Sequence, residues 1–407
     1  MNILYINHYA GSPEMGMEFR PYYLSKEWIK KGHKVTIIAS DYSHLRKRNP
    51  KVKRDFSSEV IDRIEYVWVK TGSYEGNGFK RALTMIKFVE KLHFHASFIA
   101  KRWKPDVVIA SSTYPLDSFA AHRIAYFARA KYIHEVHDMW PATLYEIGGM
   151  SKHHPFVIAM QIAENYAYRN CDGLVALAPF SKDYMVKHGL KPYKFHNIQN
   201  GVAEEEWQSS EKIPGSHSAF FNQHKGQFIV GYFGGHALSN ALDIVLDAAK
   251  ICHDQSIIFV LVGNGVEKPR LMGRKRDEKI DNVFFLDQVD KKMIPDLTDH
   301  FDCSIMSGLP SPLYRFGLCL NKMYDSMMAG KPIICAIPAP KTLVAEYGCG
   351  IQLQDITASN IVEAIYTIKG MTKEERNKIG QKGKQIILEK YTYKKLAEDF
   401  EKVFSDR

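Results

Sequence analysis

The chain segment best suited to chemistry is Tyr314–Pro332, with the sequence YRFGLCLNKMYDSMMAGKP. A turn at Gly317 leads there into a helical pattern that carries Lys322 and Asp325. These two residues are three positions apart, so they share one helix face. The free amides of a glycine turn and of a helix N-terminus can bind a phosphate, whose charge Lys322 would neutralise, and Asp325 could accept hydrogen bonds from the hydroxyls of a ribose. An exposed Lys–Asp pair after a simple turn is the alternative.

Two more glycine turns follow successive strand patterns in the second half of the chain. The first is GYFGGH at Gly231–His236, and the second is VGNG at Val262–Gly265, followed by Lys268 and Arg270. Glycine lets a backbone come close to a phosphate or a sugar. Neither turn has the G-x-G-x-x-G spacing of dinucleotide-binding proteins, and plain tight turns are the alternative. The ligand-binding residues predicted in these turns are Gly234, Gly235, Gly263 and Asn264.

A third candidate is the segment His134–Pro141, HEVHDMWP, which follows a strand pattern. Strand alternation places His134 on one face and Glu135 with His137 on the other. A metal site that includes both histidines and Asp138 is therefore disfavoured. We expect His137 and Asp138 to emerge at the carboxyl end of the strand, where His137 can hydrogen-bond a sugar hydroxyl or a developing charge. A buried histidine with satisfied hydrogen bonds is the alternative.

The loop after the first strand pattern, His8–Arg20, has the same placement and leads into an amphipathic helix. Its glycines, such as Gly16, and its charged residues Glu18 and Arg20 are candidates for contacts with an acceptor or a phosphate. An ordinary flexible loop is equally compatible with this sequence.

The excess positive charge lies in the first half of the chain. Residues 1–200 contain 29 Lys and Arg against 18 Asp and Glu, whereas the remaining 207 residues contain 26 against 27. Residues 80–104 hold seven basic residues and one acid, interleaved with Phe, Ile, Leu and Trp. Such a basic amphipathic helix can lie on an anionic membrane surface. A packed helix with a solvated basic face is the alternative, and the sequence contains no pattern typical of nucleic-acid binding.

These candidates need an alternation of short buried strands and helices to position them. Strand patterns in the first half cover 2–7, 34–40, 65–70, 107–111, 131–136, 173–176 and 195–198, with helical patterns at 20–31, 82–101, 118–130 and 155–170. The second half restarts the rhythm, with strands at 228–233, 257–262, 283–286, 303–306, 332–336 and 351–353 and helices at 241–252, 322–329 and 358–368. The pattern predicts an α/β fold of two doubly wound domains whose ligands bind in a central cleft that both sheets face.

The domain limits follow from composition. We expect a first domain over residues 1–204, a linker at 205–226 that is rich in Gly, Pro, Ser and charge, and a second domain over 227–390. The final segment, 391–407, is predicted to contain an amphipathic helix. No apolar run in the 407 residues is long enough to span a bilayer. The start lacks the features of a signal peptide, and six scattered cysteines predict neither disulfides nor a zinc site, as expected in a reducing cytoplasm.

The whole chain resembles the retaining glycosyltransferases of family 4, which have two Rossmann-like domains in the GT-B arrangement. The resemblance is greatest to the bacterial members that build O-antigen and capsule saccharides. The most specific match is Phe316-Gly317, Asn321-Lys322, Asp325 and Ala329-Gly330-Lys331-Pro332. The other matching stretches are Phe19-Arg20, Leu24, Gly32-His33-Lys34-Val35, His137-Asp138-Met139-Trp140-Pro141, Asn200-Gly201-Val202 and Gly231-Tyr232-Phe233-Gly234.

The resemblance implies that the second domain binds a nucleotide sugar and the first an acceptor saccharide. Lys322 and the amide of Leu318 would face the diphosphate, with Asn321 beside them, Asp325 would face the ribose, and His137 the transferred sugar. The final helix would cross back onto the first domain. Together with the charge of the first half, the resemblance predicts an acceptor linked to polyprenyl diphosphate and work at the cytoplasmic face of the membrane. It predicts no metal or other cofactor and no nucleic-acid partner.

Two departures from the family pattern bear on the site. The paired glutamates usual in the family are absent: Asp325 takes the place of the second, and no acid takes the place of the first. The Arg and Lys usual after the first glycine loop of the second domain are also missing from residues 238–247. This leaves Arg270 and Arg315 as candidates for diphosphate binding. The predicted catalytic residues are therefore His137, Lys322 and Arg315.

The predicted mechanism follows from the lack of a carboxylate pair, which argues against a double displacement. In the expected reaction Lys322, an arginine and helix amides stabilise the leaving diphosphate. The acceptor hydroxyl attacks on the same face, and the leaving phosphate takes its proton. A sugar-nucleotide 2-epimerase would share the architecture, whereas an NAD dehydrogenase would need the missing fingerprint. A non-enzymatic module that binds lipid or nucleic acid through the basic half is the alternative from another class.

Overall fold

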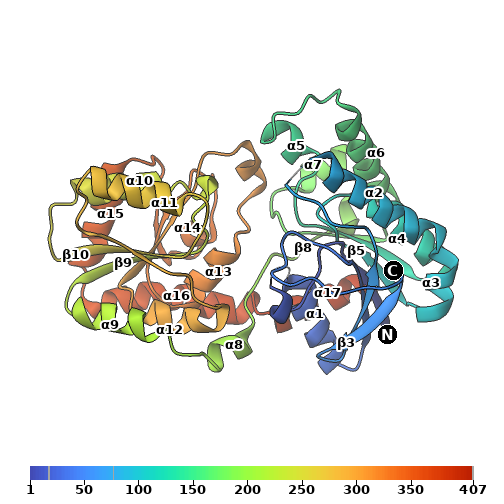
Figure 1. The fold of residues 1–407 in the computed structure, drawn as a ribbon, viewed down its shortest axis with the longest axis horizontal. Helices are drawn as coiled ribbons and strands as arrows, with labels where there is room; N and C mark the ends of the chain where they lie inside the picture. Colours follow the sequence, from blue (N-terminus) through green and yellow to red (C-terminus); the bar gives the residue numbers. More distant parts are fainter. Residues whose placement is uncertain (17–18, 77, 406–407) are drawn as a thin grey trace. The chain divides into compact units, whose positions relative to one another are not determined.

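The apolar strand patterns form two sheets in the computed structural model of the protein, which describes residues 1–16, 19–76 and 78–405 (Figure 1). By its internal contacts the chain divides into two units. The first unit comprises Met1–Asn200 with Tyr393–Arg407, and the second comprises Gly201–Thr392. Each unit contains one sheet with helices packed on it, which confirms the expected α/β class.

The sheet of the first unit has eight strands in the order β3-β4-β2-β1-β5-β6-β7-β8. Strands β1, β2 and β4 to β8 run parallel and are mostly buried, so their apolar residues follow one another without alternation. The edge strand β3 pairs antiparallel with β4 and was not predicted, because its residues are polar and exposed. The bounds are Asn2–Ile6 (β1), Lys34–Ser40 (β2), Ser57–Ile61 (β3), Ile64–Val69 (β4), Val107–Ala110 (β5), Lys131–Val136 (β6), Gly173–Ala176 (β7) and Phe195–Asn197 (β8).

The helices of the first unit fall into two groups. Figure 1 shows α1 beside α17, while α4 contacts α2, α3 and α6. The single helix expected over 82–101 is wrong, because the chain leaves helical geometry at His95 and forms α2 and α3 instead. The bounds are Phe19–Lys30 (α1), Phe79–Phe94 (α2), Ala96–Trp103 (α3), Asp117–Ala128 (α4), Ala142–Glu146 (α5), Pro155–Asn170 (α6), Lys182–Lys187 (α7) and Tyr393–Ser405 (α17).

The sheet of the second unit has six parallel strands in the order β11-β10-β9-β12-β13-β14. Its strands are Phe228–Phe233 (β9), Ile257–Val262 (β10), Val283–Leu286 (β11), Cys303–Ser307 (β12), Ile333–Ala336 (β13) and Gly350–Gln352 (β14). Its helices are Glu204–Gln208 (α8), Gly215–Gln223 (α9), Leu242–Ile251 (α10), Lys268–Asp277 (α11), Ile294–Asp299 (α12), Asn321–Met328 (α13), Leu343–Tyr347 (α14), Ala358–Gly370 (α15) and Lys373–Lys390 (α16).

The segment 205–226, expected to be a linker, is instead part of the second unit. It contains most of α8 and all of α9, and Phe221 of α9 is buried and stacks on His300 at a centroid distance of 4.4 Å. These helices are short and have little amphipathic periodicity, so the Gly, Pro and Ser content of the segment predicted a linker instead. The described part of the chain also contains no helix with the length and apolarity needed to cross a bilayer.

The last helix, α17, belongs to the first unit. It packs on α1, where the indole of Trp28 donates a hydrogen bond to the carbonyl of Ala397 at 3.2 Å. The rings of Phe400 and Phe404 both lie 5.4 Å from the ring of Trp28. All three aromatic side chains are buried, so the core of the first unit includes residues from both ends of the chain.

Both sheets have a point where the strand order reverses. In the first unit β1 pairs with β2 on one side and β5 on the other, and in the second unit β9 pairs with β10 and β12. Loops that leave the carboxyl ends of such neighbouring strands diverge and create a ligand-binding crevice. The functional candidates are therefore expected after β1, β5 and β6 in one unit and after β9, β10 and β12 in the other.

Candidate functional sites at the carboxyl ends of the two sheets

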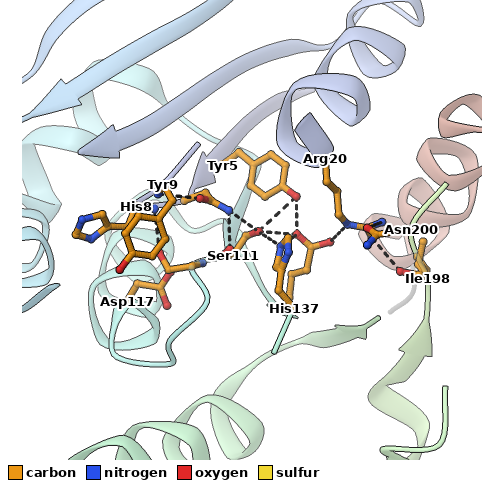
Figure 2. A network of polar contacts seen from close by, with 12 residues as sticks. Tyr5, His8, Tyr9, Arg20, Ser111, Asp117, His137, Ile198 and Asn200 are labelled. Carbon is orange, nitrogen blue, oxygen red and sulfur yellow. Dashed lines mark hydrogen bonds and ion pairs between the residues drawn. The ribbon is translucent and has the colours of Figure 1, made fainter. Parts of the chain in front are cut away.

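A buried carboxylate, Glu135, lies at the centre of a polar network in the first unit. Figure 2 shows the side chains of Tyr5, Ser111 and His137 close together in this network. The Oε2 of Glu135 accepts hydrogen bonds from the hydroxyls of Tyr5 at 2.5 Å and Ser111 at 2.6 Å. Its Oε1 accepts from Nε of Arg20 at 2.9 Å. His137 lies on the same face of β6, as strand alternation predicted, with its Nε2 3.2 Å from the carboxylate and 2.8 Å from the Ser111 hydroxyl. The network thus joins β1, β5, β6 and α1.

Arg20 uses its guanidinium within the protein. Besides Glu135, it donates to the carbonyls of Gln199 at 2.6 Å and Ile198 at 2.9 Å and to the side-chain oxygen of Asn200 at 3.4 Å. Its side chain is only 4% exposed. Arg20 thus anchors α1 to the segment that ends the first unit, and its contact with an acceptor or a phosphate stays a prediction.

The electrostatics of the network favour the ionised carboxylate. Burial alone would raise the pKa of Glu135, but the charges of Arg20 and His137, with hydrogen bonds from His137 and Ser111, hold this pKa well below its usual range. Burial would likewise lower the pKa of Arg20, but the neighbouring Glu135 carboxylate raises this pKa above its ordinary value. The two charges are thus mutually dependent, and neither has water as an alternative partner.

His137 stands at the open end of this network. It follows the last residue of β6, its side chain is 11% exposed, and Glu135 and Ser111 fix the position of its ring. A histidine oriented by a carboxylate can hydrogen-bond a ligand in one defined direction. Asp138 follows it and is exposed, and Gly16 lies in the loop after β1 with a φ of 70°. Glu18 lies outside the described residues.

The opposite face of β6 holds His134, which is 3% exposed and packs near Tyr132 and Tyr168. Within the described ranges, no three histidine, cysteine or acidic side chains are grouped so that they could hold a metal ion. The six cysteines are free thiols, as the sequence predicted.

In the second unit, two glycine turns lie against each other after β9 and β10. A Cβ atom on Gly263, whose φ is 153°, would lie 1.9 Å from the carbonyl oxygen of Gly234. Only glycine fits this contact. With Gly235 and Asn264 the turns line a hollow of about 240 Å³, completed by Gln288, Val289 and Ile294. The four glycine-turn residues predicted from sequence are therefore brought together.

Lys322 of α13 reaches the first glycine turn. Its Nζ donates to the side-chain oxygen of Asn240 at 2.5 Å and to the hydroxyl of Tyr232 at 3.3 Å. Both partners in turn donate to the carbonyl of Gly235 at 2.8 Å. Burial lowers the pKa of Lys322 to about 8. The ammonium is charged at neutral pH and is held by neutral partners beside the backbone of the turn.

The remaining predicted residues of the second unit fall in three places. Gly317, with a φ of 96°, buried Leu318 and exposed Asn321 form the entry to α13. Asp325 faces α8, where it accepts a hydrogen bond from Trp207, and burial raises its pKa. Lys322 and Asp325 thus contact different neighbours, although they are three residues apart.

The two candidate arginines have partners within the protein. Arg270 is bound by the carboxylates of Asp243 at 2.5 Å and Glu267 at 2.7 Å. Arg315 is exposed, donates to the carbonyl of Pro312 at 2.6 Å and lies over the ring of Phe316. With two acids on its guanidinium, Arg270 does not fit the predicted role of a diphosphate ligand.

Sequence reasoning missed several residues of both sites. Tyr5, Ser111 and Glu135 orient His137, and Tyr232 and Asn240 hold Lys322. The alternation of β6 was a usable signal for Glu135, because it placed this carboxylate on the face of His137. Contacts between residues about 80 to 90 positions apart, such as those of Lys322, have no signal in a single sequence.

The chain matches two protein-family models. Residues 15–206 match the model described as Glycosyltransferase Family 4, and residues 227–368 match Glycosyl transferases group 1. Together the two models cover most of the chain and identify it as a glycosyltransferase of the family 4 type. An uncharacterized glycosyltransferase of Methanocaldococcus jannaschii is 23% identical over 241 residues, which are 58% of this chain and 59% of that protein. The match therefore spans less than two thirds of this relative.

Solved structures of glycosyltransferases share the fold of this chain. Sucrose-phosphate synthase from Thermosynechococcus elongatus is 15% identical, with a TM-score of 0.74 over 100% of this chain and 98% of that one. Anabaena HepE, solved in complex with UDP and glucose, is 16% identical, with a TM-score of 0.67 over 100% of both chains. These similarities establish the GT-B fold for the chain.

Replacing Glu135 by Gln should destabilise the first unit by about 3–5 kcal/mol, because the charge of Arg20 would remain buried without a counter-charge. Since the pKa of Glu135 is depressed, the ion pair stabilises the fold above the pKa of an unfolded glutamate, and this contribution is lost as the pH falls below about 4.5. Urea unfolding should therefore give a constant difference in the free energy of unfolding between the wild type and the variant from pH 6 to 8. This difference should become smaller below about pH 4.5. The control Glu14→Gln removes an exposed ion pair with Arg48 and should cost less than about 1 kcal/mol. Equal effects of both variants would contradict the assigned role.

If Lys322 binds the phosphates of a nucleotide, as the sequence predicts, replacing it by Met should lower affinity for nucleoside diphosphates, because the half-buried ammonium would meet their negative charge. In the wild type this affinity should fall as the pH rises through about 8, where Lys322 loses its proton, and the variant should lack this inflection. Isothermal titration with UDP and GDP between pH 6.5 and 9.5 measures both effects. Lys378→Met, a change at an exposed lysine of α16, should leave the profile unchanged. An unaltered pH profile in the Lys322 variant would exclude this residue from the phosphate site.

Proposed function

We propose that this family 4 protein transfers a sugar from a nucleotide-diphosphate sugar to a saccharide acceptor. The second unit binds the donor, and the first unit binds the acceptor. The observation that carries the proposal is the Lys322 ammonium, which lies beside the paired glycine turns with neutral hydrogen-bond partners. A half-buried cation beside a glycine turn that a ligand can approach closely is suited to a diphosphate.

The donor assignment has support from relatives of the same fold. Structures of Anabaena HepE contain UDP and UDP-glucose. In the present chain, the hollow of about 240 Å³ between the glycine turns and Gln288 is the proposed site of the nucleotide. Asp325 and the entry to α13 at Gly317 and Leu318 are proposed to contact the ribose and the phosphates.

The proposed chemistry uses charge rather than a covalent intermediate. As the bond between the anomeric carbon and the diphosphate oxygen breaks, Lys322 stabilises the negative charge that forms on the leaving group. The acceptor oxygen forms the new bond on the same face of the sugar, and its proton passes to the leaving phosphate, so that configuration is retained. His137, oriented by Glu135, binds the transferred sugar. The scheme assigns no step to a metal or other cofactor, because Lys322 supplies the positive charge.

The proposed acceptor is a saccharide linked to polyprenyl diphosphate, of the kind used in bacterial surface polysaccharides such as O-antigen and capsule. The excess of basic residues in the first 200 positions supports an acceptor presented at an anionic membrane. Helix α2 adds a surface for this contact. Its apolar residues Phe79, Leu83 and Ile86 are exposed at positions i, i+4 and i+7, next to Lys80 and Lys87.

Thermal unfolding with UDP, GDP, CDP and NAD tests the donor assignment. A ligand at about 100 times its Kd adds about 2.7 kcal/mol of stability. For a unit of this size that corresponds to a shift of roughly 5–10 °C. We expect a shift with one family of nucleoside diphosphates, none with NAD, and a smaller shift in the Lys322→Met variant. No shift with any nucleotide would contradict the proposed transferase and favour a non-enzymatic binding protein. Release of free sugar or epimerised donor without an acceptor would instead indicate an epimerase.

Sedimentation with vesicles tests the membrane contact. We expect binding to vesicles of phosphatidylcholine with phosphatidylglycerol, weak binding to phosphatidylcholine alone, and loss of binding at about 0.5 M NaCl, where charges are screened. The double variant Phe79→Ser with Lys87→Glu should bind several-fold less, while Lys378→Glu in the second unit should bind normally. Equal binding of the wild type to both kinds of vesicle would contradict the proposal.

A further inference from the structure

The long connection between β2 and β3 contains the densest positive charge of the chain. Residues 46–54, with the sequence RKRNPKVKR, include six Lys or Arg and no acid. Arg46 is buried and fixes the connection to its neighbours. Its guanidinium donates to the carbonyls of Ala10 and Ser40 and lies over the ring of Trp68. The other five cations, Lys47, Arg48, Lys51, Lys53 and Arg54, are exposed.

These exposed cations have few counter-charges. Arg48 lies 3.5 Å from Glu14, an ion pair in which both side chains are more than 70% exposed. Within the described ranges, the side chains of Lys47, Lys51, Lys53 and Arg54 have no hydrogen bond or ion pair. Of the nearby acids, Asp55 is paired with Lys91 at 2.7 Å. Glu59, which also lines the hollow, accepts from the neutral Trp68 indole at 2.7 Å and keeps its charge, so the basic residues of the segment outnumber the acids.

The charged segment surrounds a hollow rather than a flat surface. The hollow has a volume of about 840 Å³ and is lined by the segment 48–54 together with Met15, Ser57, Ser58, Glu59 and Trp68. A second hollow of about 470 Å³ shares Arg54, Ser57 and Ser58 with it and adds Arg102 of α3. A concave surface of this size can enclose a few sugar residues, whereas a planar bilayer cannot enter it.

The hollow adjoins the carboxyl edge of the first sheet. The amides of Lys47 and Arg48 both donate to the carbonyl of Met15, at 2.8 and 3.4 Å, so the segment lies on the loop that follows β1. The side chain of Lys47 also lies within 3.1 Å of the position of a Cβ on Gly16, a predicted acceptor contact. The same edge carries His137 at the end of β6.

We propose that this hollow binds negatively charged groups of the acceptor saccharide, so that the acceptor is a glycan bearing several carboxylate or phosphate groups on its sugars. The inference rests on the proposed function and specifies its acceptor. Lys51, Lys53 and Arg54 contact the anionic groups, Arg48 exchanges Glu14 for the ligand, and the bound glycan extends toward His137. Uncompensated cations in a concave site raise the local concentration of anions and give a salt-dependent affinity.

Direct binding tests the proposal without requiring transfer. We would titrate the full protein with hexagalacturonate, a carboxylate-bearing hexasaccharide, and with the neutral maltohexaose of equal length. Hexagalacturonate should bind at least about tenfold more tightly and should weaken as salt is added. Charge-assisted hydrogen bonds are strong enough that the double variant Lys51→Glu with Arg54→Glu should lose about tenfold or more in affinity. The control Lys104→Glu with Arg129→Glu has the same change of charge near the amino ends of β5 and β6 and should stay within about twofold.

Each other result has a defined meaning. Equal affinity for both hexasaccharides, or equal loss in both double variants, would overturn the proposal. If Lys51→Glu with Arg54→Glu lowers binding to phosphatidylglycerol vesicles but leaves hexagalacturonate binding intact, the segment contacts the membrane and the proposal is wrong. The shift in melting temperature with nucleoside diphosphates should be the same in this variant and the wild type. If the wild type itself shows no shift in melting temperature with any nucleoside diphosphate, the proposed transferase function has failed. That result is independent of whether the hollow binds an anionic glycan.

Discussion

The ion pair between Arg20 and Glu135 joins parts of the first unit that are far apart in the sequence. Glu135 comes from β6, Arg20 from the start of α1, and the remaining donors of the guanidinium reach the carbonyls of the segment that ends this unit. Because both charges are excluded from water, each needs the other and the surrounding hydrogen bonds. Tyr5 of β1 and Ser111, which directly follows β5, complete the hydrogen bonds of the carboxylate. The orientation of His137 is therefore a property of the whole arrangement and not of its own strand.

The second unit holds its half-buried charge differently, because the partners of Lys322 are neutral. Lys322 is surrounded by an amide oxygen, a phenol hydroxyl and a glycine turn, so its positive charge is positioned without being neutralised. A carboxylate partner would have compensated this charge and competed with an incoming anion, as Asp243 and Glu267 do at Arg270. Charge that is needed for structure is paired within the protein, whereas charge that is available to a ligand has neutral neighbours. Around the hollow of the first unit, Lys47, Lys51, Lys53 and Arg54 likewise have no carboxylate partner among the described contacts, whereas Arg48 pairs with Glu14.

Much of the architecture could be predicted from the sequence, because buried parallel strands leave continuous apolar runs and turns leave glycines. The strands of both sheets and the grouping of Gly234, Gly235, Gly263 and Asn264 were accessible in this way. The polar edge strand β3 and the helices of 205–226 lacked such a signal. The roles of side chains were harder to predict. Arg20 and Arg270 are of a residue type that often binds anionic ligands, and only the three-dimensional contacts reveal that carboxylates of the protein bind them. Asn240 and Lys322 are 82 positions apart, and nothing in one sequence connects them.

The path of the chain has a consequence for how the protein is made. The first unit is completed by α17, whose Phe400 and Phe404 pack on Trp28, although the 192 residues of the second unit lie between them in the sequence. During synthesis the ribosome releases the N-terminal 200 residues long before α17 exists. Until α17 has been made, Trp28 lacks the rings of Phe400 and Phe404, so the nascent chain presents an apolar patch on α1 while the second unit is being made. The second unit is continuous in sequence and can complete its fold before α17 is made. The order in which the two units complete folding is then the reverse of the order in which they are synthesised.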